Sequence, residues 1–474
     1  MCRFGGLRKG EPPARSLDRR AARDSVPCNP SIPMMSLSLS RLGAQRLRFS
    51  ALALFSAILA PASRGADGGS PAPFYLRDGD RVVFYGDSIT EQTFWGVGAY
   101  ADFTETYVLT RFPKLKVDFT NSGWGGDAVS WSGGGQVDKR VERDIVAHRP
   151  TVVTIMLGMN DGKYQAFDPA LFKAYRDGYR RIVGTLSREL QGVRLTLIEP
   201  SPYDDITRPA LFEGGYNAVL LRYSEFVRGL AAGLGQNVAD FNTPVVGVLR
   251  RAELADPALA QRIINDRIHP GPGAHLVMAE ALLRSWKAPS LVAEVGIDAA
   301  TGLASAQRAR VSNLKVGSSI TWSQIDESLP MPADLSDPAV ALAVANSDFF
   351  DALDREPLRV TGLAAPSYAL KIDGTPIGVF TREELDSGIN LARFPTPMAT
   401  QAAAVQKLTA RRNHFRFVGW HWIEVVLGQQ DSTDAIQRAV PALLRAVDAE
   451  ETEIVGQQRA AAQPVPHAFE LDPQ

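Results

Sequence analysis

Short apolar runs separated by polar stretches recur between residues 74 and 290. The run from Thr151 to Met156 is almost entirely apolar, which is typical of a strand in a parallel sheet covered on both faces. The β-branched and aromatic run from Arg81 to Tyr85 also predicts a strand. Three further runs of this kind lie at 115–119, 194–198 and 237–241. The pattern therefore predicts five strands in this region.

Segments of helical length lie between and after these strands, at 91–111, 136–147, 171–189, 216–233 and 274–286. Parallel neighbouring strands need a long crossover connection, which is usually a helix. The alternation therefore predicts an α/β fold with a doubly wound, flavodoxin-like, five-stranded parallel sheet and flanking helices. We place this domain at 67–298. In such sheets, ligands bind beyond the carboxyl ends of the strands.

The pattern changes after this domain. The run at 368–380 alternates apolar and polar residues around an Asp-Gly pair, which is a strong hairpin signal. We therefore expect a small β-rich accessory unit at 299–382. The remaining region, 383–474, is predicted to be helical, with helices at 398–412 and 433–458. These helices could pack back onto the α/β domain.

An aromatic cluster lies within the predicted helical region. It consists of Phe415, Phe417, Trp420, His421 and Trp422. Aromatic side chains at helical spacing most often belong to a buried core, which is the interpretation we favour. The alternative is a surface that stacks against sugar rings.

The N-terminal segment has a different character from the rest of the chain. In residues 34–66, arginines precede the apolar run from Ala51 to Ala60 and small residues follow it, as in a secretory signal peptide. The run is too short to span a bilayer as a helix, although a buried amphipathic helix or an uncleaved anchor is the alternative. Residues 1–33 do not fit a signal, and we interpret them as a wrongly assigned or disordered extension. A secreted or periplasmic protein without stable membrane insertion is expected.

Composition and charge exclude several classes of protein. The 51 basic and 52 acidic residues give a formal net charge of −1, which argues against binding of nucleic acid through bulk positive charge. Residues 1–66 carry 11 of the basic and 3 of the acidic residues, so the rest of the chain has a net charge of about −9. The two cysteines, Cys2 and Cys28, exclude a disulfide-rich scaffold and a multi-cysteine metal site. We expect no cofactor and no metal.

Three of the predicted strands end in turns with candidate chemistry. Gly86-Asp87-Ser88 places a serine between a strand and a helix, where its hydroxyl and a backbone amide can face a substrate. The alternative is that Ser88 only caps the helix. In the second turn, Gly126 allows close approach of the backbone to a ligand. In the third, Asn160 could donate an amide hydrogen bond, or could simply form an Asx turn.

The last turn of this domain adds a candidate base. Imidazole accepts protons near neutral pH, and an aspartate three residues before His269, Asp266, can contact its other ring nitrogen. His275 lies at the start of the next helix, and we interpret it as structural. Asp204 and Asp205 form a carboxylate pair with no histidine near in sequence, which we interpret as a solvated turn.

Taken together, these four turns resemble the motifs of the SGNH hydrolase superfamily, also called GDSL lipases/esterases. The resemblance covers roughly residues 80–287. It includes one departure, because Ile89 stands where the name of the family has leucine. The resemblance implies an acyl-enzyme mechanism that needs no metal.

The resemblance also implies a role for each motif residue. The catalytic residues would be Ser88 as nucleophile, Asp266 and His269. The oxyanion hole would be formed by the backbone amides of Ser88 and Gly126 and by the side chain of Asn160.

These observations predict an exported serine esterase that removes short acyl groups, acetyl above all, from a carbohydrate. The partner would be a small ester or an acylated carbohydrate, with no nucleic acid. The carbohydrate part depends only on the predicted export, on the added β unit and on the habits of similar secreted family members. A lysophospholipase or thioesterase acting on lipids is the enzymatic alternative. A glycan-binding module on an inactive hydrolase scaffold is the alternative from another class, although it predicts a damaged motif.

Overall fold

The structure, a computed structural model, describes residues 73–474 except 96–97 and 429–432. The predicted extension at 1–33 and the predicted signal peptide at 34–66 lie outside the described residues. Within the described part of the chain, no helix is both long and apolar enough to cross a membrane.

The predicted parallel sheet is confirmed, with strand order β2-β1-β3-β4-β5. Its strands are β1 (Arg81–Gly86), β2 (Asp118–Gly123), β3 (Val152–Met156), β4 (Arg194–Glu199) and β5 (Asn237–Asp240). Every residue of β3 is buried, as its apolar sequence predicts for a central strand. All neighbouring strands are parallel, so their carboxyl ends meet at one edge of the sheet.

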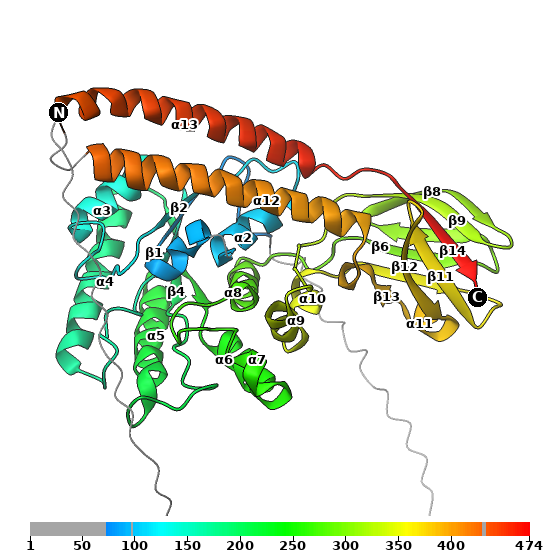
Figure 1. Ribbon diagram of the computed structural model, residues 1–474, viewed down its shortest axis with the longest axis horizontal. Coiled ribbons are helices and arrows are strands. Elements are labelled where there is room, and N and C mark those ends of the chain that lie inside the picture. The colour runs from blue at the N-terminus through cyan, green and yellow to red at the C-terminus, as the bar shows by residue number, and fades with distance from the viewer. Residues whose placement is uncertain (1–72, 96–97, 429–432) are drawn as a thin grey trace, which may run out of the picture. The chain divides into compact units, whose positions relative to one another are not determined.

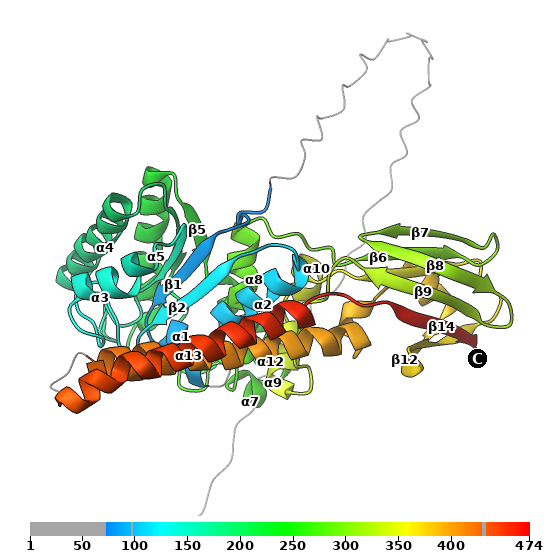
Figure 2. The ribbon, with the colours of Figure 1, turned by 90° about the horizontal axis from the view of Figure 1, so that it is seen from above.

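Helices cover both faces of this sheet. Figures 1 and 2 show α3, α4 and α5 on one side and α2 and α8 on the other. The helices of the domain are α1 (Ser88–Glu91), α2 (Tyr100–Arg111), α3 (Val137–Asp144), α4 (Pro169–Glu189), α5 (Gly215–Leu234), α6 (Thr243–Ala255), α7 (Pro257–Ala260) and α8 (Pro272–Ser285), together with the 3-10 turns η1 (Gln92–Trp95) and η2 (Val146–His148).

The sequence of α4 shows why these segments are helical. Asp168 caps its first turn by accepting hydrogen bonds from the backbone N–H groups of Ala170 and Leu171. Pro169 stands at the first position, where its missing N–H costs nothing. The buried side chains of α4 then follow at helical spacing, at Tyr175, Tyr179, Ile182, Val183 and Leu186.

The accessory β unit consists of two sheets that share one apolar core. One sheet has the order β13-β10-β6-β7 and the other β12-β11-β14-β9-β8. Their strands are β6 (Glu294–Asp298), β7 (Leu303–Gln307), β8 (Ala309–Val316), β9 (Ile320–Asp326), β10 (Pro357–Thr361), β11 (Ser367–Ile372), β12 (Thr375–Thr381), β13 (Ile389–Asn390) and β14 (His467–Pro473). The predicted hairpin is present as the antiparallel pair β11 and β12.

This unit takes strands from beyond the predicted range 299–382. β6 precedes the range, and β13 and β14 lie in the region predicted to be helical. β14 lies between β11 and β9 in the five-stranded sheet and pairs with both. Its partner β11 lies about 100 residues earlier in the chain, and β9 about 150 residues earlier. The apolar alternation of Phe469 and Leu471 supports this placement, because both side chains are buried in the shared core.

Short helices separate the strands of this unit, namely α9 (Pro338–Ala345), α10 (Phe349–Leu353), α11 (Arg382–Ser387) and the 3-10 turn η3 (Leu391–Arg393). The last helical region consists of α12 (Pro397–Phe417), its π-helical continuation η4 (Val418–Leu427) and α13 (Asp434–Ala461). α12 lies beside α2 and α13, as both views show.

A buried polar cluster holds α12 against the α/β domain, and we call it the Arg412 cluster. The guanidinium of Arg412 contacts carboxylate oxygens of Glu105 at 2.8 Å and Glu451 at 3.0 Å, and it donates to a backbone carbonyl of β2. Asn413 donates to Asp102 at 2.7 Å. These contacts join α2, α12 and α13.

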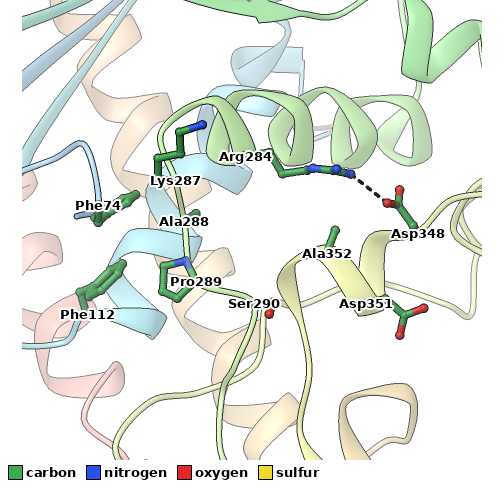
Figure 3. A pocket seen from close by; sticks show the side chains of 10 residues that line it. All are labelled: Phe74, Phe112, Arg284, Lys287, Ala288, Pro289, Ser290, Asp348, Asp351 and Ala352. Atoms are coloured by element: carbon green, nitrogen blue, oxygen red, sulfur yellow. Dashed lines mark hydrogen bonds and ion pairs between the residues drawn. The ribbon is translucent and has the colours of Figure 1, made fainter. Parts of the chain in front are cut away.

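A cavity of about 750 Å³ lies at the far end of α8, between Arg284 and the helix α10 (Figure 3). Its lining residues come from the carboxyl end of α8, from Phe74 and from α10. The 14-residue helix is about 21 Å long and begins three residues after His269. This cavity is therefore remote from the candidate chemistry.

Candidate active site

Ser88 lies directly beyond the carboxyl end of β1. Gly86 ends the strand, and a Cβ at this position would lie 2.1 Å from the hydroxyl of Thr90, so only glycine fits. Asp87 caps α1 by accepting a 3.0 Å hydrogen bond from the N–H of Ile89. Ser88 is thus the first residue of the helix and not its cap, and its half-buried side chain is left for other contacts.

His269 and Asp266 lie near the end of the domain in sequence, and the fold brings His269 into contact with Ser88. Nε2 of His269 lies 2.9 Å from the hydroxyl of Ser88, although the two residues are 181 positions apart. Nδ1 of His269 lies 2.6 Å from Oδ2 of Asp266. The three side chains form one continuous hydrogen-bonded chain.

The turn that carries these residues is shaped by Asp266 itself. Its Oδ1 accepts hydrogen bonds from the backbone N–H groups of Ile268 at 3.0 Å and His269 at 2.7 Å. Burial alone would raise the pKa of Asp266, but the hydrogen bonds from His269 and from the backbone hold it below its usual value. Asp266 is therefore ionised at neutral pH and can orient the imidazole ring.

The prediction of a solvated turn at Asp204 and Asp205 is wrong. Asp204 is fully buried, and its carboxylate accepts hydrogen bonds from the backbone of Ile206 and Thr207. Its own N–H donates to the carbonyl of Arg267, which has a left-handed φ of 74°. The pair is buried because it anchors the turn that presents His269, a contact between segments about 60 residues apart.

His275 has the structural role that its position predicts. It is fully buried, its Nδ1 accepts from the N–H of Tyr100, and its Nε2 lies 3.2 Å from Oε1 of Gln92. Burial lowers the pKa of His275 to about 3, so the ring is neutral. Gln92 in turn donates to the carbonyl of Pro270, which ties the turn after α1 to the turn of His269.

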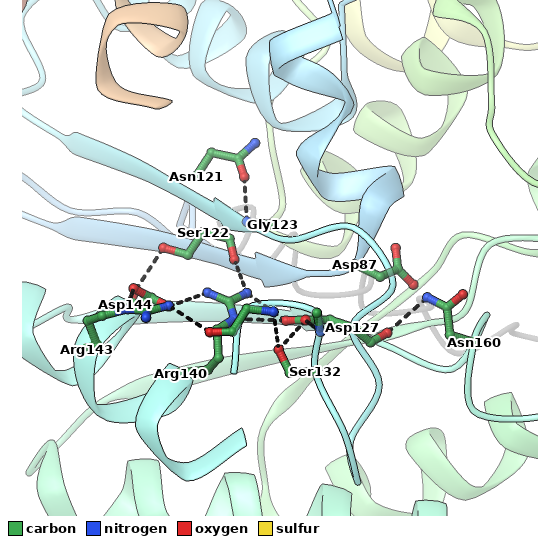
Figure 4. Close-up of polar contacts among 12 residues, drawn as sticks. Asp87, Asn121, Ser122, Gly123, Asp127, Ser132, Arg140, Arg143, Asp144 and Asn160 are labelled. Carbon is green, nitrogen blue, oxygen red and sulfur yellow. Dashed lines mark hydrogen bonds and ion pairs between the residues drawn. The ribbon is translucent and has the colours of Figure 1, made fainter. Parts of the chain in front are cut away.

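Gly126 lies in the turn after β2, in a left-handed conformation with a φ of 78°. Its N–H has no acceptor among the described residues. The next residue, Asp127, is fully buried and ion-paired with Arg140 at 2.7 Å (Figure 4). Arg140 also pairs with Asp144 and donates to the carbonyl of Ser122. This network holds the turn after β2 in place.

Asn160 follows β3 and is nearly buried. Its side-chain amide donates to the carbonyl of Asp127 at 3.0 Å, and its side-chain oxygen accepts from the hydroxyl of Tyr164 at 2.7 Å. The amide thus bridges the second and third turns, which goes beyond an ordinary Asx turn. We refer to Ser88, Gly126, Asn160, Asp266 and His269 as the Ser88 site.

Three buried carboxyl groups lie behind the Ser88 site. Burial raises the pKa of Asp87 to about 8 and that of Asp161 to about 7, and the nearby Asp127 contributes to both shifts. Burial also raises the pKa of Asp127 above its usual value, even though Arg140 opposes the shift. Asp87 is therefore largely protonated near neutral pH and adds little negative charge beside Ser88.

The aromatic cluster of the C-terminal region packs partly against the turn after β2. Trp420 donates to a carboxylate oxygen of Asp144 at 2.7 Å, and its ring contacts Trp124 edge-on. The ring of His421 lies 3.9 Å from that of Trp124. Trp422 is 52% exposed. The other four side chains of the cluster are only half-buried, so the interpretation of the cluster as buried core is wrong.

Sequence reasoning missed Tyr164, Gln92 and Arg140. The i, i+4 spacing of Arg140 and Asp144 on one helix was a signal for an ion pair, but nothing local indicated the contact of Arg140 with Asp127. Among the residues that the structure describes, no group of three or more His, Cys, Asp or Glu side chains is arranged to hold a metal ion.

An α/β fold with a serine, a histidine and an aspartate in hydrogen-bonding order at the strand ends is typical of enzymes that hydrolyse esters. Residues 84–277 match the sequence model of the GDSL-like Lipase/Acylhydrolase family. This part of the chain is a GDSL-like hydrolase domain of the SGNH superfamily, and the protein is a hydrolase of ester bonds.

The chain is similar to an acetylxylan esterase from Geobacillus stearothermophilus, with 26% identity over 226 residues that cover 44% of this chain and 94% of that protein. It is also similar to the structure of a gut microbial diltiazem-metabolizing enzyme, with 27% identity and a TM-score of 0.70. That match covers 84% of this chain and 98% of the other. A crystal structure of the acetylxylan esterase matches with 23% identity and a TM-score of 0.35, over 45% of this chain and 96% of that one.

Proposed function

We propose that the protein is an exported serine esterase that removes acetyl groups from a carbohydrate, with Ser88 as nucleophile. The observation that carries the proposal is the chain of hydrogen bonds from Asp266 through His269 to Ser88, at 2.6 and 2.9 Å. This order of acid, base and hydroxyl is what acyl transfer by serine requires.

In the acylation step, Nε2 of His269 takes the proton of the Ser88 hydroxyl as its oxygen attacks the ester carbonyl. The carboxylate of Asp266 stabilises the resulting imidazolium and keeps the ring oriented. The former carbonyl oxygen becomes an oxyanion, and the backbone N–H groups of Ser88 and Gly126 and the side-chain amide of Asn160 donate hydrogen bonds to it. His269 then gives its proton to the departing alcohol, and the acyl group remains on Ser88.

In the deacylation step, His269 takes a proton from water while the water oxygen attacks the acyl carbon. The same donors stabilise the second oxyanion, and the carboxylic acid leaves as the proton returns to Ser88. An oxyanion-hole donor of this kind contributes on the order of 10²–10³ in kcat. No step of this sequence needs a metal.

The similarity to the acetylxylan esterase supports the choice of an acetylated carbohydrate. Export follows from the leader pattern at 34–66, which would bring the enzyme to substrates outside the cytoplasm. We further propose 67–298 as the catalytic domain, 299–382 as the centre of the accessory β unit, and 383–474 as a C-terminal region that packs on the catalytic domain.

The experiment that tests the proposal measures hydrolysis of p-nitrophenyl esters of increasing chain length and of acetylated xylo-oligosaccharides. Ser88→Ala should abolish turnover, whereas Ser187→Ala, on the exposed face of α4, should not change it. Full activity of Ser88→Ala would refute the assigned nucleophile. A preference for long acyl chains would replace the carbohydrate with a lipid substrate.

The diltiazem-metabolizing relative favours a second candidate, an enzyme for esters of small drug-like molecules. That relative matches 84% of the chain, whereas the acetylxylan esterase matches under half of it. Both substrates should be offered to the same enzyme preparation. A kcat/KM for diltiazem above that for acetylated xylo-oligosaccharides would favour the second candidate.

A further inference from the structure

Tyr164 contacts the Ser88 site from a position that none of the four motifs contains. Its hydroxyl donates to the side-chain oxygen of Asn160 at 2.7 Å. The same carboxamide donates one N–H to the carbonyl of Asp127 at 3.0 Å. A carboxamide has one acceptor oxygen and two N–H donors, so a single N–H of Asn160 remains, and it has no acceptor among the described residues.

We propose that Tyr164 is a positioning residue that holds the carboxamide of Asn160 with its remaining N–H toward the substrate oxyanion. The inference rests on the proposed function, because it assumes that Asn160 serves the oxyanion hole. Two hydrogen bonds, one to each end of the amide, fix both its rotation and its flip. A donor on the amide oxygen also polarises the group and makes its N–H a stronger donor.

The backbone conformation around Tyr164 brings its side chain to Asn160. Lys163 and Tyr164 both have left-handed φ values, 52° and 55°, which non-glycine residues rarely adopt. Such conformations persist where the surroundings impose them, and they concentrate at functional sites. The N–H of Lys163 donates to the backbone carbonyl of Asn160 at 3.1 Å, so the turn folds Tyr164 back over Asn160.

Packing holds the ring of Tyr164 in this position. It lies 5.2 Å from the ring of Tyr216 and 6.2 Å from that of Tyr203. Tyr216 is itself anchored, because its hydroxyl donates to the carbonyl of Met159 at 2.6 Å. Burial, together with the nearby carboxylate of Asp266, raises the pKa of Tyr164 above its usual value. Its hydroxyl therefore stays a donor throughout the pH range of an esterase assay.

The test is a double-mutant cycle of Tyr164→Phe and Asn160→Ala, assayed with p-nitrophenyl acetate. Asn160→Ala alone should lower kcat about 100-fold or more, as expected for loss of an oxyanion donor. Tyr164→Phe alone should lower kcat about 5- to 20-fold, with KM changed less than twofold. In the Asn160→Ala background, Tyr164→Phe should change kcat by less than twofold, because the residue acts through Asn160.

Tyr203→Phe is the matched control, since it removes a hydroxyl from the same ring cluster without a bond to Asn160. It should leave kcat and the melting temperature unchanged, and the melting temperature of Tyr164→Phe should show that this variant is folded. An unchanged kcat for Tyr164→Phe, an equal loss in both backgrounds, or a rise in KM alone would overturn the inference.

These outcomes separate the inference from the proposed function. If Ser88→Ala and Asn160→Ala are both severely impaired and Tyr164→Phe is not, only the role of Tyr164 fails. If Ser88→Ala or Asn160→Ala retains full activity, the assigned site fails and the role of Tyr164 fails with it.

Discussion

Two buried polar regions of the molecule, the Ser88 site and the Arg412 cluster, use their hydrogen-bonding groups differently. In the Arg412 cluster, the guanidinium contacts two carboxylates and a backbone carbonyl, and Asn413 contacts Asp102. In the Ser88 site, the N–H of Gly126 and one N–H of Asn160 have no acceptor among the described residues. Satisfied groups stabilise an interface, and groups without a protein partner are available to a substrate.

The difference also extends to charge. Arg412 carries a full charge that is balanced by Glu105 and Glu451. Behind Ser88, burial raises the pKa of Asp87 to about 8, so this carboxyl group is largely neutral near pH 7. The two regions should therefore respond oppositely to mutation, with activity lost at the Ser88 site and stability lost at the Arg412 cluster.

The largest expected effect is that of Asp266→Asn on activity. The amide cannot balance the charge of the imidazolium or enforce its tautomer, so kcat should fall on the order of 10⁴-fold. The melting temperature should change little, because the Asp266 side chain is 54% exposed. Steady-state kinetics and thermal unfolding provide the two measurements. Asp256→Asn, at the cap of α7, is the control and should match the wild type, and equal activity of the two variants would contradict the assignment.

Arg412→Met should have the opposite profile. It leaves the buried carboxylate of Glu105 without its arginine, while Glu451 keeps its ion pair with Arg416, so the free energy of unfolding should fall by about 3–5 kcal/mol. Urea unfolding followed by circular dichroism measures this loss. The kcat of the folded fraction should change less than about threefold. A large fall in kcat without loss of stability would show that the two regions are not separable in this way.

Asp87→Asn tests the neutral state of the buried carboxyl group. The raised pKa means that the folded protein keeps this proton between about pH 4 and pH 8 while the unfolded chain releases it, so stability falls as pH rises through that interval. The limit is about 1.4 kcal/mol per pH unit, and relaxation of the structure should reduce the difference between pH 5 and pH 8 to about 2 kcal/mol.

Asparagine does not titrate but still accepts the N–H of Ile89, so Asp87→Asn should retain the cap and lose this part of the pH slope. Guanidinium unfolding at pH 5, 6.5 and 8 compares the two slopes. Identical slopes for the variant and the wild type would mean that Asp87 is ionised in the folded protein.

The smallest effect is expected for Trp420→Phe. It removes the 2.7 Å hydrogen bond to Asp144 while keeping most of the contact with Trp124, and the cost should be about 1 kcal/mol of stability. Trp422→Phe, at an exposed position of the same helix, is the control and should cost less. A larger loss of stability for Trp422→Phe than for Trp420→Phe would mean that the exposed side of η4 contributes more to stability than the contact with Asp144.

Much of the α/β domain could be predicted from local patterns. The apolar runs and the helical segments between them predicted the five parallel strands, and the parallel arrangement brings strand ends together. That is why Ser88 and Asn160 could be placed at one edge before their contacts were known. The β unit was predicted only in part. β14 pairs with β9 and β11 across more than 90 residues, and a local sequence pattern does not identify which distant strands pair.

Among the polar residues, the outcome depended on the range of the contacts. The bond between Asp266 and His269 spans three residues and could be inferred from their spacing. Asp204 holds a turn about 60 residues away, and its spacing alone suggested a surface turn. Tyr164 was missed because its contact with Asn160 depends on a left-handed backbone conformation, which folds Tyr164 back over Asn160.

The sequence by itself determined the order of strands and helices and the residue types available at each strand end, because these follow from periodicity and short-range sterics. The tertiary structure decided which polar groups are paired and which are left for a substrate. That outcome depends on packing and burial, which bring distant segments together and assign each donor its acceptor. Ser88 and Arg412 are both polar residues of helices, and only their surroundings distinguish a site from an interface.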